Sequence, residues 1–130
     1  MGKAYDDSRF AVTKFLTFPG HCDLINAAGN VSQMTFDEDI ILIEFGVIMT
    51  ETMNLTAAST ATVQLREGST VLGVITLATG STIGSVYSTR TLTTTAIDAG
   101  NTLIFYQNVS TVTIGECDGY VTYRERFKSG

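Results

Sequence analysis

The 130-residue sequence has no tryptophan, one proline and one histidine, and only 16% of its residues are charged. A single histidine, His21, leaves no multi-histidine metal site unless subunits share ligands. The formal net charge of −5 argues against nucleic-acid binding, because neutralising phosphates needs clustered Lys and Arg. The lack of tryptophan also weakens the case for an aromatic platform that binds carbohydrate. Thr, Ser, Gly and Asn take the place of charges, and a surface of this kind is easily desolvated by a partner.

Targeting signals and long hydrophobic runs are also missing. Residues 1–9 lack the apolar core of a signal peptide, and no stretch is long and apolar enough for a transmembrane helix. We therefore expect a soluble protein made in a cytoplasm, with no membrane partner. In a reducing compartment Cys22 and Cys117 are expected to be free thiols, although the sequence leaves open whether they pair.

The most hydrophobic stretch, residues 40–49, is the one around which the rest of the chain is organised. Both alternating sets of positions are apolar, and Glu44 is its only charged residue. A short run rich in β-branched residues predicts a central strand covered on both sides, with a buried helix as the alternative. The strand is expected to continue to Met53.

Shorter strands and turns fill the rest of the chain. Alternation over 62–66 and 71–77, with Glu67-Gly68-Ser69 between them, predicts a hairpin. Further strands are expected at 9–18, 34–36, 87–95, 103–106, 108–115 and 120–127, with turns at 19–20, 37–39, 96–101 and 117–119. Because no segment has a helical period, we predict an all-β fold: an antiparallel β-sandwich, jelly-roll-like, over residues 9–130, with a flexible N-terminal arm at 1–8.

Candidate metal and catalytic sites are weak. His21, Cys22 and Cys117 could surround zinc, but they supply three ligands where a structural site wants four. Asp37-Glu38-Asp39 could bind calcium, yet the run lacks the glycine and the distal Glu of a calcium loop, which favours a solvated turn. Residues 80–84 are not a nucleophile elbow, since Thr82 occupies the central position. We therefore expect no catalytic residue, no cofactor and no metal, and hence not an enzyme.

Four segments, at residues 41–47, 63–68, 97–103 and 119–125, resemble in texture the small β-sandwich structural proteins of tailed bacteriophage virions, such as capsid decoration or cement proteins. The resemblance implies a non-enzymatic virion protein that binds the major capsid protein as an oligomer, most often a trimer. It carries over no functional residue. Separately, the N-terminal arm and the basic end of the last strand are expected to contact the partner, through Tyr5, Asp6, Asp7, Arg9, Arg124 and Arg126. A carbohydrate- or receptor-binding module of a phage tail or fibre is the alternative.

Overall fold

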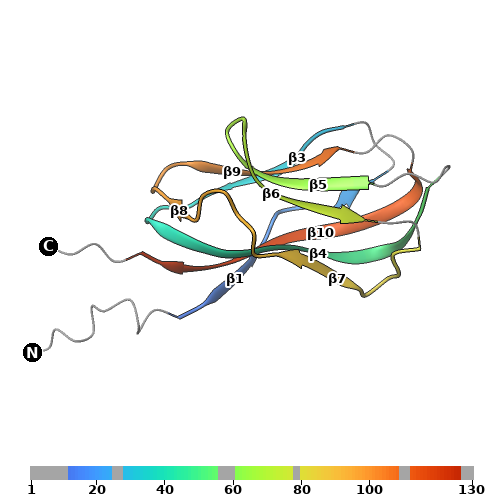
Figure 1. The fold of residues 1–130 in the computed structure, drawn as a ribbon, viewed down its shortest axis with the longest axis horizontal. Coiled ribbons are helices and arrows are strands. Elements are labelled where there is room, and N and C mark those ends of the chain that lie inside the picture. Colours follow the sequence, from blue (N-terminus) through green and yellow to red (C-terminus); the bar gives the residue numbers. More distant parts are fainter. Residues whose placement is uncertain (1–11, 25–27, 56–60, 78–79, 109–111, 127–130) are drawn as a thin grey trace, which may run out of the picture.

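A computed structural model describes residues 12–24, 28–55, 61–77, 80–108 and 112–126. The described residues form ten β-strands in two antiparallel sheets packed face to face (Figure 1). The strands are β1 (Lys14–Thr17), β2 (Cys22–Asp23), β3 (Gly29–Thr35), β4 (Ile40–Leu55), β5 (Ala61–Glu67), β6 (Thr70–Leu77), β7 (Val86–Thr89), β8 (Ala96–Ile97), β9 (Thr102–Asn108) and β10 (Val112–Glu125).

The strand order is that of a jelly roll. One sheet has the order β1-β10-β4-β7, with β2 added beside β10 and β8 beside β4, and the other has the order β3-β9-β5-β6. Successive long strands cross between the layers except at the β5–β6 hairpin, and the first strand lies next to the last while β4 lies next to β10. The predicted antiparallel, jelly-roll-like sandwich is confirmed.

Strand β4 is the longest strand of the described chain, and it pairs with β10 along most of its 16 residues. The expected continuation through Met53 is confirmed. The side chains of Phe45, Val47 and Met49 are fully buried between the sheets, and the Phe45 ring meets Phe105 of β9 edge-on at a centroid distance of 5.9 Å. This contact between two aromatic rings packs one sheet against the other.

A bulge in β4 explains why both alternating sets of positions are apolar. Leu42 lies opposite Tyr123 and Glu44 lies opposite Thr122, so that Ile43 is an extra residue in the ladder. The inward set therefore changes from even numbers, Ile40 and Leu42, to odd numbers beyond the bulge. The expectation that β4 is covered on both sides is wrong for the described chain, because its outward residues Ile41 and Ile48 are only half-buried.

Other boundaries differ from those predicted. The hairpin of β5 and β6 is confirmed, with Gly68 at φ 61° in its turn. The expected turn at 117–119 is instead the middle of β10, because Gly119 lies under the Phe105 ring and pairs with Val47. Residues 21–33, for which the sequence predicted no strand, contain β2 and most of β3, and the strand expected at 87–95 ends at Thr89. Residues 1–11, which include the predicted arm, lie outside the described ranges.

The described part of the chain contains no helix that is both long and apolar enough to span a bilayer.

Candidate functional site

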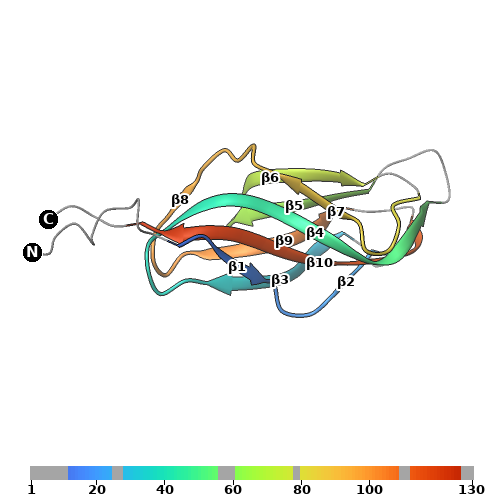
Figure 2. The ribbon, with the colours of Figure 1, turned by 90° about the horizontal axis from the view of Figure 1, so that it is seen from below.

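The side of the six-stranded sheet that faces away from the core is the first candidate, and we call it the outer face. Figure 2 looks toward this sheet, with β4 and β10 crossing its centre between β1 and β7. Cross-strand partners share a face, and the register places Tyr120 beside Gly46, and Val86 beside Ile48. The outer face also carries Phe15, Thr17, Ile41, Glu44, Ser88, Thr122 and Arg124.

A stack of three residues forms the centre of the outer face. The Tyr120 ring lies across Gly46, where any Cβ would come closer than 3.0 Å to the ring. Phe15 of β1 covers the same ring at a centroid distance of 4.8 Å, so that Tyr120 is only 5% exposed while Phe15 is 55% exposed. The missing side chain at Gly46 is thus what lets an aromatic ring lie flat on this sheet.

Glu44 is a half-buried charge beside this stack. Its carboxylate accepts a hydrogen bond of 3.5 Å from the Tyr120 hydroxyl and lies 3.7 Å from Nε of Arg90. Burial raises the pKa of Tyr120, and the neighbouring Glu44 carboxylate raises it further. Because Tyr120 therefore stays protonated, it can act as a hydrogen-bond donor here and not as a base.

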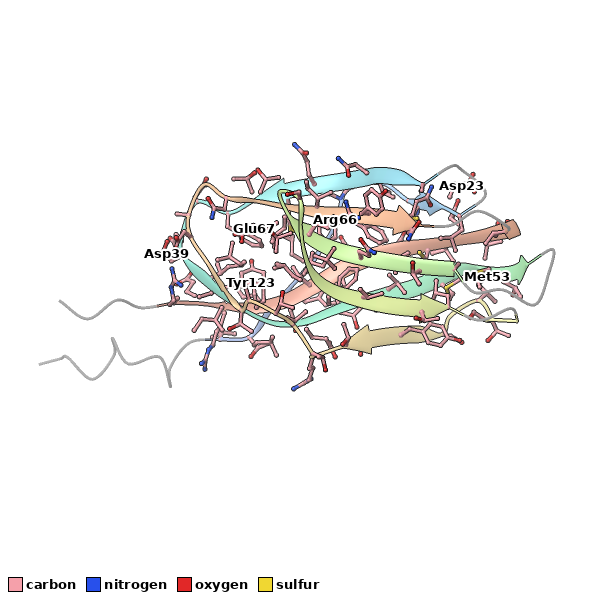
Figure 3. The ribbon with its side chains drawn as sticks, turned by 45° about the horizontal axis from the view of Figure 1, so that its top comes forward. Asp23, Asp39, Met53, Arg66, Glu67 and Tyr123 are labelled. Carbon is pink, nitrogen blue, oxygen red and sulfur yellow. The ribbon has the colours of Figure 1, made fainter. Side chains whose placement is uncertain are left out.

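The exposed large hydrophobic side chains lie mainly along two opposite edges of this sheet. Phe15 and Leu16 lie on the edge strand β1, with Val12 two residues before it, and Val86 lies on the edge strand β7, with Ile83 three residues before it. By contrast, the outward side of the four-stranded sheet is largely polar. Arg66, labelled in Figure 3, lies on this side, with its guanidinium 3.6 Å from the centre of the Tyr106 ring and its Nε donating a hydrogen bond to Gln64. Of the large hydrophobic side chains exposed in the described residues, only Val74 lies on that sheet.

The two predicted contact arginines that the structure describes differ in their surroundings. Arg124 lies on the outer face opposite Ile41, and its Nε is buried without a hydrogen-bond partner. Arg126 is engaged within the chain, with one guanidinium nitrogen 2.5 Å from Asp98 and 3.6 Å from Asp39. Tyr5, Asp6, Asp7 and Arg9 lie outside the described residues, so the partner contacts of all six residues stay a prediction.

The residues of the hypothetical zinc site separate into two groups. Cys22 and Cys117 are directly opposite each other in the β2–β10 pair, and both are buried free thiols. His21 is exposed, and its Nδ1 pairs with the carboxylate of Asp118, with Glu116 3.9 Å away. These carboxylates raise the pKa of His21, chiefly through the Asp118 hydrogen bond. The described residues contain no group of three side chains placed to hold a metal ion, and this includes the turn at 37–39.

A pocket of about 190 Å³ lies at the end of the sandwich that carries Asp39 in Figure 3. Phe36 and Tyr123 form an aromatic wall, with ring centroids 4.7 Å apart. Lys14 and Glu125 close its rim through an ion pair of 2.9 Å. The pocket is small for an organic ligand, and its one lysine is already neutralised, so the outer face is the stronger candidate site.

The fold defines an all-β jelly-roll protein. Comparisons with known proteins do not assign it to a family. No protein-family model matches the sequence, and no curated protein is similar to it. Among solved structures, the chain is similar to one from Bacillus endospore appendages, which are described as disulfide-linked pili. The TM-score is 0.44, with 16% identity over 89% of each chain.

Proposed function

We propose that this chain is a non-enzymatic structural subunit that works by burying the exposed hydrophobic edges of its six-stranded sheet against further copies of itself. The observation that carries the proposal is the set of exposed hydrophobic side chains at the two edges of this sheet, which nothing in the described chain covers, set beside a largely polar outward side on the other sheet. Soluble antiparallel sheets normally present polar residues to water. Exposed hydrophobic side chains gathered at both edges of a sheet therefore indicate a protein interface.

The placement of the apolar side chains supports a closed ring, for which a trimer is the simplest form. The β1 edge and the β7 edge are different surfaces at opposite sides of one sheet. Contact of one edge with the other in the next copy is heterologous, and such contacts form rings when the rotation closes. Short edge strands with unpaired backbone groups can also extend a sheet across the joint.

The finer form of this proposal places the ring on a phage capsid. There the subunit would decorate the shell by binding the major capsid protein, and would be found in the virion after synthesis in the host cytoplasm. The low charge and the sequence texture support this reading. Purified particles are expected to contain the chain in a fixed ratio to the major capsid protein, and particles without it would contradict the virion location but not the self-assembly.

Three substitutions test the joint. Phe15→Glu and Val86→Glu each place a charge on one edge, and Val74→Glu places the same charge on the four-stranded sheet as a matched control. Sedimentation velocity should show that the first two variants dissociate to monomers while Val74→Glu keeps the wild-type assembly. Thermal unfolding of each monomer checks that the fold survives.

A mixing experiment separates a heterologous joint from a face-to-face dimer. Each edge variant keeps the edge that the other has lost, so an equimolar mixture of Phe15→Glu and Val86→Glu should form a dimer of one chain of each kind. The dimer cannot grow, because both outer edges carry the introduced glutamate. A mixture that stays monomeric, or assembly that Val74→Glu disrupts equally, would contradict the proposal.

A further inference from the structure

The pairing of β2 with β10 places two cysteines in an arrangement that the assembly role does not use. Cys22 and Cys117 are directly opposite in the antiparallel register, and each is 0% exposed. Opposite residues in such a pair have Cα atoms about 4.5–5.5 Å apart and point to the same face. A disulfide needs a Cα separation of about 4.4–6.8 Å, so the backbone already meets its main requirement.

We propose that Cys22 and Cys117 form an intramolecular cross-strand disulfide when the chain is exposed to a disulfide oxidant such as oxidised glutathione. The first thiolate attacks the sulfur–sulfur bond of the oxidant, forms a mixed disulfide and releases one small thiol. The second thiolate then attacks the mixed disulfide, forms the Cys22–Cys117 bond and releases the second small thiol. The two electrons and two protons that the cysteines lose reduce the oxidant to two thiols.

The contacts of the two sulfur atoms support this pairing. The neighbouring Cys22 side chain, together with burial, raises the pKa of Cys117. Cys22 also donates to Oε1 of the buried Gln107 at 3.1 Å, and oxidation gives up this donation. Both thiols are shielded by burial, and the raised pKa keeps Cys117 protonated in the folded chain, which slows its attack on an oxidant.

Access to the thiols therefore depends on the opening of β2. This strand has two residues and two ladder partners, and it lies at the end of the sandwich marked by Asp23 in Figure 3. Local opening of so short a strand needs far less free energy than global unfolding. Oxidation is expected to be fast during refolding and slow in the native state.

The disulfide would close a loop of about 95 residues, so its effect on stability should be large. In the chain-entropy account it restricts the unfolded chain, and the oxidised protein should melt roughly 10 °C or more above the reduced protein. Adding a reductant together with mild denaturant should return the melting temperature to the reduced value.

The test is to refold the full chain in a glutathione redox buffer, block the remaining thiols and measure the mass. Oxidation should lower the intact mass by about 2 Da, and trypsin should release residues 15–66 linked to residues 91–124. Cys22→Ala, treated in the same way, should show neither the link nor the rise in melting temperature. Full alkylation of both wild-type cysteines, a bond found only between two chains, or a link that lowers the melting temperature would overturn the proposal. None of these outcomes depends on self-assembly.

Discussion

Replacement of Gly46 by alanine tests the packing at the centre of the outer face. A Cβ at position 46 would lie closer than 3.0 Å to Cζ, Oη and Cε1 of Tyr120, whereas ordinary contact begins near 3.4 Å. The ring must move outward by about 1 Å or more, away from Gly46 and against Phe15. Overpacking of a buried ring typically costs about 1–3 kcal/mol, and we expect about 2 kcal/mol lost from the free energy of unfolding.

Urea unfolding of a double-mutant cycle isolates the cause. In a Tyr120→Ala background the clash is gone, so Gly46→Ala should be neutral or stabilising by about 0.5–1 kcal/mol, as alanine is generally preferred to glycine within a strand. Gly29→Ala in β3 is the control, because nothing lies within 4 Å of a Cβ there. An equal loss from Gly46→Ala in both backgrounds would refute the role of Tyr120.

Two charge contacts give further predictions. The Asp118 carboxylate raises the pKa of His21 in the folded chain. The pair therefore stabilises the fold fully at a pH below the pKa of His21 in the unfolded chain, about 6.5. This stabilisation is lost as the pH rises through the pKa of His21 in the folded chain. NMR titration of this sole histidine should therefore give a midpoint above about 6.5 that Asp118→Asn lowers, and an unchanged midpoint would contradict the contact. Arg126→Gln removes the contacts of Arg126 to Asp39 and Asp98. It should lower the urea midpoint more than Arg90→Gln does, because the Arg90 side chain is 74% exposed. The difference between the two variants should shrink in high salt. Equal effects of the two substitutions would argue against the Arg126 contacts.

Local patterns in the sequence predicted the sandwich, the long β4 and the β5–β6 hairpin, because alternation and turn residues are local signals. The errors arose where distant pairing decides the structure. Asp118-Gly119 has the composition of a turn, yet the ladder with β4 and the Phe105 ring keep it within β10. The bulge at Ile43 could not be predicted either, since it depends on a register with a strand some eighty residues away.

The same limit applies to the candidate site. The apolar outward residues of β4 were visible in the sequence, but they were assigned to a second covered face within the chain. Only the register places Tyr120 over Gly46 and brings Phe15 onto it. The direct opposition of Cys22 and Cys117 likewise follows from β2, a strand of two residues that is too short to show a pattern.

The central claim is that copies of this chain cover the exposed hydrophobic edges of the six-stranded sheet for one another. Light scattering of the purified wild-type chain across a range of concentrations tests it most directly. The account predicts a stable mass of three or more times the 14.0 kDa of one chain, which holds on dilution as a closed ring should. A mass of 14.0 kDa at every concentration would contradict it.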